Sequence, residues 1–74
     1  MSDQAAKFAG TWAENAANRV DKVQSLEELD AWIISNRYHL ADVERANPPA
    51  WEKLRARLHA LDQEIRERIR QGVG

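Results

Sequence analysis

Few side chains in this sequence are placed where they could do chemistry. The two histidines, His39 and His59, fall in different predicted helices, and neither has metal-ligand spacing such as HExxH around it. With no cysteine, a thiolate metal site, a thiol nucleophile and a disulfide are all excluded. Hydroxyls such as Thr11 and Ser25 have no activating base nearby, and Ser25 fits a structural role as a helix cap. We therefore predict no catalytic, metal-binding or cofactor-binding residue, and interpret the protein as a non-enzyme.

The charges of the sequence argue against nucleic acid as a partner. Eleven Lys and Arg stand against 12 Asp and Glu, so the net charge of −1 provides no attraction toward phosphates. The arginines of the C-terminal third fall on both flanks of an apolar seam, and Asp62–Arg66 and Glu64–Arg68 have the spacing of i,i+4 ion pairs. We expect no direct nucleic-acid binding. Residues 1–50 hold five basic and eight acidic residues (net −3) and residues 51–74 six and four (net +2), so the two parts attract each other.

Capping and breaking residues divide the chain into three predicted helices. The first covers about residues 3–23, and the capping-box sequence SLEE at 25–28 opens a second helix that spans about 26–45. The Pro-Pro pair at 48–49 ends it, because the residue before a proline avoids helical angles and proline suits the first turn of the next helix. A third helix covers about residues 50–70.

Each predicted helix has apolar residues at spacings of three and four, which is typical of a helix packed on others. These residues are Ala5, Phe8, Trp12, Ala16, Val20 and Val23; Leu26, Leu29, Trp32, Ile33, Leu40 and Val43; and Trp51, Leu54, Leu58, Leu61 and Ile65. A row of alanines, Ala9, Ala13, Ala16 and Ala17, also leaves the first helix a thin surface that another helix could approach closely. Short connections make consecutive helices antiparallel neighbours. We expect an all-α fold, one domain over residues 1–74, formed as a three-helix bundle: a helical hairpin plus the N-terminal helix.

Nothing in the sequence predicts export or membrane insertion. The first residues lack the positive charge and apolar run of a signal peptide, and no stretch approaches the roughly 18 apolar residues of a membrane helix. The absence of cysteine fits a reducing compartment. We expect a cytoplasmic protein that contacts no membrane.

A smaller apolar face on the second predicted helix is the best candidate for binding a partner protein. Ile34 and Tyr38 lie off its core stripe and are bordered by charged residues. In protein interfaces, apolar and aromatic anchors are surrounded by a polar rim in the same way. The same two side chains could instead cover the first helix. The candidate interface residues are Ile34, Arg37, Tyr38, Asp42 and Arg45, with Arg57 and Arg68 on the third helix as a second surface.

Two further features leave alternatives open. Trp12, Trp32 and Trp51 fall one per helix, so they either meet in the core or place at least one ring in an interface. Asn36 lies inside the core stripe of the second helix. A buried asparagine there could fix helix register or oligomeric state, or it could sit at a gap that admits water.

The run SLEELDAW at 25–32, followed by Asn36, Leu40, Pro48 and the run WEKL at 51–54, resembles a recurrent phage module. Similar helical segments form the C-terminal tails of phage recombination proteins of the single-strand-annealing type. The resemblance covers about residues 12–68. The annealing core of that family is absent from this chain, so the resemblance carries over no DNA-annealing activity. It implies a phage, prophage or gene-transfer-agent origin.

Two functions follow from this resemblance as hypotheses. Small stand-alone phage proteins of this size are often inhibitors of host machinery, anti-CRISPR proteins among them. The first hypothesis is therefore a non-enzymatic protein that binds a host protein complex and inhibits or modulates it. The second is a helical accessory or adaptor of phage recombination or replication, which assembles through its helices and could do so as a homodimer. Both require a protein partner, and neither requires a cofactor.

Overall fold

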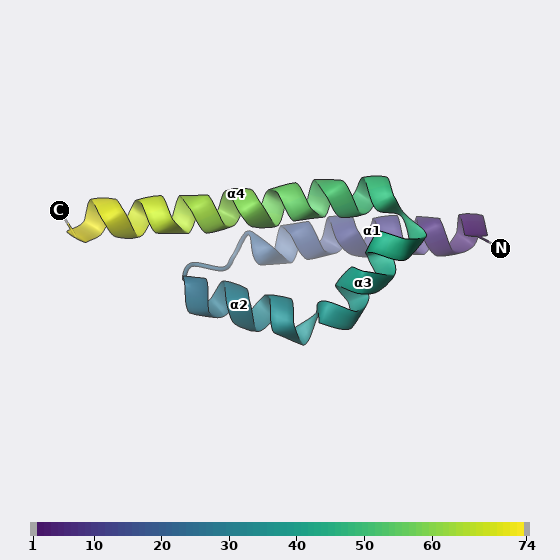
Figure 1. The fold of residues 1–74 in the computed structure, drawn as a ribbon, viewed down its shortest axis with the longest axis horizontal. Coiled ribbons are helices and arrows are strands. Elements are labelled where there is room, and N and C mark those ends of the chain that lie inside the picture. The colour runs from purple at the N-terminus through teal and green to yellow at the C-terminus, as the bar shows by residue number, and fades with distance from the viewer. Residues whose placement is uncertain (1, 74) are drawn as a thin grey trace.

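The computed structural model describes residues 2–73, and nearly all of them are helical (Figure 1). The helices are α1 (Ser2–Val20), α2 (Leu26–Ser35), α3 (Arg37–Ala46) and α4 (Pro48–Val73), with no strand among the described residues. The all-α prediction is confirmed. The structure has four helices instead of the three expected, because the predicted 26–45 helix is interrupted at Asn36 and forms both α2 and α3.

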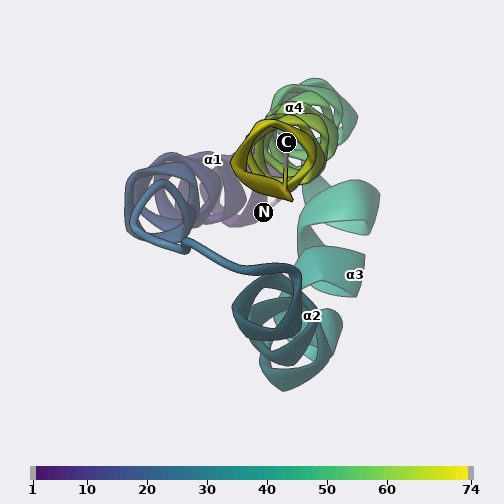
Figure 2. The same cartoon turned by 90° about the vertical axis from the view of Figure 1, so that its left-hand side faces the viewer.

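The four helices form an elongated body of 53 × 19 × 16 Å. The long helices α1 and α4 lie side by side and run in the same direction, while α2 and α3 return along them in the opposite direction (Figures 1 and 2). Helix α3 packs on both α1 and α4, whereas α2 leans mainly on α4. No helix within residues 2–73 has the length and apolar character needed to cross a membrane.

The core lies between an alanine face of α1 and the leucine seam of α4. Its buried residues are Ala9, Ala13, Ala16 and Val20 of α1; Leu29 of α2; Leu40 and Val43 of α3; and Leu54, Leu58, Leu61 and Ile65 of α4. The row of small side chains lets α1 approach α4 closely, as the sequence indicated. Phe8 belongs to the predicted apolar stripe of the first helix but does not pack in the core, since its side chain is 77% exposed. A phenyl ring on the alanine face would hold the two long helices apart.

The helix ends follow local capping chemistry. The Ser25 hydroxyl accepts a hydrogen bond from the Glu28 N–H at 3.1 Å, and the Glu28 carboxylate accepts one from the Gln24 N–H at 3.3 Å. The predicted capping box is therefore present, although Glu28 reaches the residue before the cap. Helix α1 ends at Val20 instead of the predicted residue 23, because the Val23 N–H bonds to the Val20 carbonyl in a tight i−3 turn. At the other end of the chain, α4 extends the predicted 50–70 helix by one turn or less at each side.

Asn47 joins three helices at the α3–α4 connection. Its side-chain oxygen accepts a hydrogen bond from the Ala50 N–H at 3.2 Å and caps α4, while its amide nitrogen donates to the Ala6 carbonyl of α1 at 2.9 Å. Gly10 makes room for this contact, since a Cβ atom at position 10 would lie 3.2 Å from the Asn47 amide nitrogen.

Asn47→Ala is expected to lower the free energy of unfolding by about 1–3 kcal/mol, because it removes a helix cap and an interhelical hydrogen bond together. Asn47→Asp is the matched control, because its carboxylate still caps α4 but cannot donate to the Ala6 carbonyl. The fall in the free energy of unfolding that it causes therefore measures the interhelical hydrogen bond alone. Urea unfolding followed by far-ultraviolet circular dichroism measures the free energy of unfolding of the two variants. Wild-type stability in Asn47→Ala would show that this connection contributes nothing.

Candidate protein-interaction site

A bend between α2 and α3 shapes the candidate interface. Asn36 has φ −110° and ψ 13°, outside the helical region, and its side-chain amide donates to the Trp32 carbonyl at 2.8 Å. Its backbone N–H also points to the last turn of α2, 3.1 Å from the Trp32 oxygen. Asparagine side chains that bond to nearby backbone groups compete with helix continuation. Neither sequence interpretation of Asn36 included this role, which is to end α2.

Ile34 and Tyr38 stand on either side of this bend and face solvent. Their exposed fractions are 59% and 72%. The alternative that the two side chains cover the first helix is therefore wrong. These two large side chains, four positions apart in the chain, are not among the residues that form the core or pack against it.

Arg37 orders the surface between these two side chains. Its guanidinium donates to the Ile34 carbonyl at 3.0 Å, and its central carbon lies 4.7 Å from the centroid of the Tyr38 ring. A second guanidinium nitrogen lies 3.4 Å from the Tyr38 hydroxyl. At an exposed site a cation–π contact contributes about 0.5–1 kcal/mol, which favours this arrangement of Arg37 and Tyr38. We call Ile34, Arg37 and Tyr38 the bend ridge.

The other candidates from the second predicted helix, Asp42 and Arg45, lie on α3 and form an ion pair with each other. Both side chains are largely exposed. Within the described residues, neither of them forms a hydrogen bond with the bend ridge. They lie along the rim of a groove between α1 and α3. The structure therefore divides the predicted site into a ridge and a separate charged rim.

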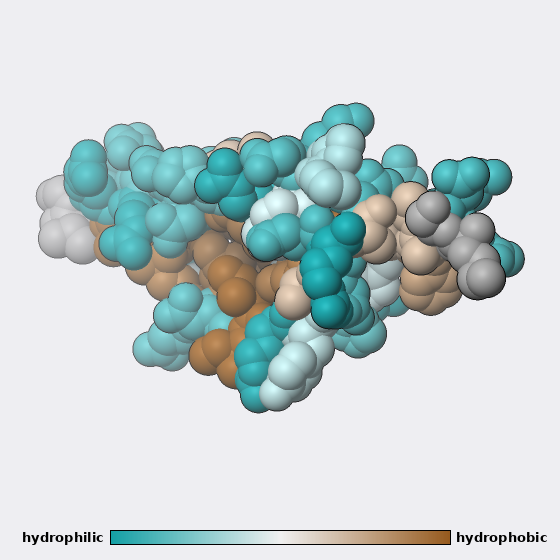
Figure 3. Space-filling model, turned by 45° about the vertical axis from the view of Figure 1, so that its right-hand side comes forward, coloured by the Kyte–Doolittle hydropathy of each residue, from teal (hydrophilic) through white to brown (hydrophobic). Residues whose placement is uncertain are grey.

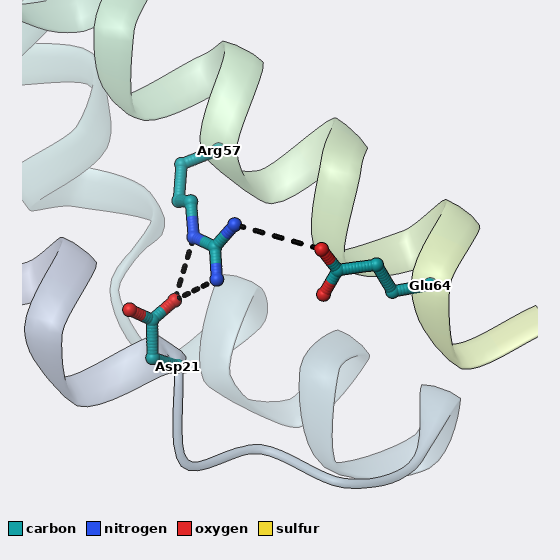
Figure 4. Close-up of polar contacts among 3 residues, drawn as sticks. All are labelled: Asp21, Arg57 and Glu64. Atoms are coloured by element: carbon teal, nitrogen blue, oxygen red, sulfur yellow. Dashed lines mark hydrogen bonds and ion pairs between the residues drawn. The ribbon is translucent and has the colours of Figure 1, made fainter. Parts of the chain in front are cut away.

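The two candidates on α4 have different surroundings. The Arg57 Nε lies 2.6 Å from the carboxylate of Asp21, just beyond the end of α1, and its Nη1 lies 3.8 Å from Glu64 (Figure 4). Arg57 thus ties α4 to α1, in keeping with the attraction expected between the acidic and basic parts of the chain. Arg68 is exposed near the end of α4. The structure does not bring either of them to the bend ridge.

Sequence reasoning missed an apolar groove between α1 and α3, which we call the α1–α3 groove. It encloses about 500 Å³. It is lined by Ala5, Phe8, Ala9 and Trp12 of α1 and by His39, Asp42, Val43, Arg45 and Ala46 of α3. The available signal was the i,i+4 pair of Phe8 and Trp12 within the predicted apolar stripe of the first helix.

Aromatic rings close one end of this groove. The Trp12 ring stacks on His39 with centroids 5.2 Å apart and lies 6.5 Å from the ring of Trp32. All three tryptophans are half-buried, so they pack at the margin of the core instead of meeting at its centre. Figure 3 shows hydrophobic residues gathered in the middle of one face of the molecule, between hydrophilic residues.

A second hollow of about 750 Å³ lies along α1 and α4 and is lined mainly by small and polar residues, among them Gly10, Thr11 and Lys53. Within residues 2–73, no group of three or more His, Cys, Asp or Glu side chains is arranged to hold a metal ion.

No protein-family model, curated protein or solved structure matches this chain.

Proposed function

We propose that this chain is a non-enzymatic protein that docks on a protein complex through the bend ridge. Following the phage-type resemblance, we further propose that the complex belongs to the host and that docking inhibits or modulates it, as an anti-CRISPR protein would. The observation that carries the proposal is the exposure of Ile34 and Tyr38, 59% and 72%, on the two sides of the bend at Asn36, with Arg37 lying over the Tyr38 ring.

The chemistry of the bend ridge supports a protein partner. Tyrosine and arginine are enriched among the residues that contribute most binding energy in protein interfaces. Contacts within the ridge also favour its arrangement before any partner arrives, because Arg37 bonds to the Ile34 carbonyl and lies over the Tyr38 ring. Pre-ordering lowers the entropy cost of association and so favours affinity.

The ion pairs of α4 support protein over nucleic acid as the partner. Arg55, Arg66 and Arg70 lie 3.2, 3.0 and 3.6 Å from Glu52, Asp62 and Glu67. Phosphates would have to compete with these carboxylates and with Asp21, which holds Arg57. Binding to nucleic acid depends on such cations being available for phosphate contacts.

A protein without catalytic residues changes a partner only by occupying its surface or by shifting its conformational states. Within this proposal, the bend ridge is therefore both the recognition element and the active element. The charged side chains nearest to it, together with the exposed polar face of α2, would form the rim that surrounds its apolar anchors.

Affinity purification with mass spectrometry from the native host tests the proposal. The baits are the wild-type chain, the double variant Ile34→Ala/Tyr38→Ala, and Ile69→Ala, which removes an exposed apolar side chain far from the ridge. We expect the wild type and Ile69→Ala to retain the same host protein complex and the double variant to lose it. Equal capture by all three baits would contradict the proposal. Retention of a phage annealing protein or exonuclease would instead assign the chain to recombination.

A further inference from the structure

Phe8 is the most exposed large apolar side chain among residues 3–72, with an exposed fraction of 77%. It stands on the α1 wall of the α1–α3 groove and leaves the hollow of about 500 Å³ beside it open. A projecting phenyl ring and an apolar hollow therefore lie next to each other on one surface of the molecule.

Two contacts hold α1 next to α3. Within the groove, the Trp12 ring stacks on His39 with centroids 5.2 Å apart. Just after the end of α3, Asn47 donates to the Ala6 carbonyl of α1 at 2.9 Å, and these two residues lie outside the groove lining. Between these contacts the floor is formed by buried apolar residues, Ala9 of α1 and Val43 of α3.

We propose that the occupant of this groove is α1 of a second copy of the chain. In a two-fold symmetric dimer the same patch faces itself, so a residue of one copy contacts the hollow of the other and the reverse contact is made at the same time. The patch meets this requirement, since each copy offers one projecting ring, Phe8, and one hollow to receive it. Each phenyl ring would then be buried between the α1 and α3 walls of the partner copy.

The charges around the groove favour a second copy over a strongly charged partner. The α1 wall, Ala5, Phe8, Ala9 and Trp12, carries no charge. The two charged residues on the α3 wall, Asp42 and Arg45, are paired with each other. An unpaired charge near a two-fold axis would lie close to the same charge of the other copy and repel it, and the internal pair avoids this repulsion.

The area required is compatible with the size of the chain. A stable interface of standard size buries about 800 Å² on each partner, roughly one-seventh of the 5656 Å² of this surface. A buried aromatic side chain supplies about 150–250 Å². The two phenyl rings would therefore provide a substantial part of the contact, and the exposed Ala5 beside each ring adds little bulk between the two α1 helices.

This inference is independent of the proposed function, because Ile34, Arg37 and Tyr38 do not line the groove. A dimer formed through α1 would present two bend ridges, one on each copy. Loss of the dimer and loss of partner capture are thus separate outcomes of separate substitutions.

Sedimentation equilibrium over a concentration series tests the dimer. The wild type is expected to approach twice its monomer mass of 8.5 kDa as concentration rises. Phe8→Ala should raise the dimer dissociation constant at least about a hundredfold, since each dimer loses two rings and each ring contributes about tenfold or more. Ala5→Glu, which places a charge in the same patch, should dissociate the dimer independently. Both positions are exposed, so the helical circular dichroism spectrum should be retained.

Tyr38→Ala and Ile69→Ala are the matched controls, and both should dimerise as the wild type does. A wild type that stays monomeric at every concentration would overturn the inference. So would a dimer that resists Phe8→Ala and Ala5→Glu, or one that is dissociated by Tyr38→Ala instead. Phe8-dependent capture of a different protein by a monomeric wild type would also exclude the second copy as the occupant.

Discussion

Leu54→Ala is expected to lower the free energy of unfolding by about 2–5 kcal/mol, the range for deleting most of a buried leucine side chain. Leu54 is only 2% exposed and lies in the seam of α4. The free energy of unfolding of a domain of this size is small, because net stability is about 0.05–0.15 kcal/mol per residue. We therefore expect a large fraction of the variant to be unfolded at moderate temperature.

Ile69→Ala is the control for this prediction. Ile69 is on the same helix but is 51% exposed, so its truncation leaves no cavity. Its effect should stay within about 0.5 kcal/mol of wild type, as for most surface substitutions. Urea unfolding followed by far-ultraviolet circular dichroism measures both variants, and equal losses at positions 54 and 69 would contradict the described packing of α4.

Tyr38→Ala is expected to weaken the complex with the captured partner by about 2 kcal/mol, roughly thirtyfold in dissociation constant. The phenol ring is 72% exposed, and its removal also frees the Arg37 guanidinium that lies over it. Because the ring packs on no core residue, the melting temperature should change little. Calorimetric titration and thermal melting of the same preparation separate the two effects. A lower melting temperature with unchanged affinity would place Tyr38 in the fold instead of the interface.

Local chemistry made several elements of the fold predictable. The capping box at Ser25 and Glu28 depends on contacts between neighbouring residues, and its hydrogen bonds are present in the structure. The prolines that open α4 act through backbone sterics alone. The α4 seam has one continuous spacing of three and four, so only one face of the helix could be its buried side.

Two features of the fold were not predicted from the sequence: the bend at Asn36, where the Asn36 side chain bonds to the Trp32 carbonyl, and the face of α1 that packs on α4. No proline or glycine marks the bend at Asn36, and helix propensity alone favours a continuous helix over 26–45. In α1, the stripe containing Phe8 and the stripe of alanines have the same period, so periodicity alone could not show which one faces α4. Close packing of the two long helices selects the alanines, and this choice leaves Phe8 exposed.

Part of the candidate site was predictable, because helix periodicity alone places some of its residues, whereas contacts between distant residues were not predictable. Ile34 and Tyr38 lie off the core stripe in the sequence, and the structure exposes both. The α1–α3 groove brings together residues far apart in the sequence, such as Trp12 with His39, which are 27 positions apart, and it depends on the bend that redirects α3. Arg57 was predicted as an interface candidate from its helix position. Its pairing with Asp21 became visible only in three dimensions.

Photo-crosslinking in host extract tests the central claim most directly, because it asks whether the bend ridge touches the partner. A photoreactive tyrosine analogue is placed at position 38, and for comparison at position 69 of α4, another exposed site. We predict that the probe at position 38 forms a covalent adduct with one protein of the captured complex and that the probe at position 69 does not. An adduct formed from position 69 and none from position 38 would contradict docking through the bend ridge.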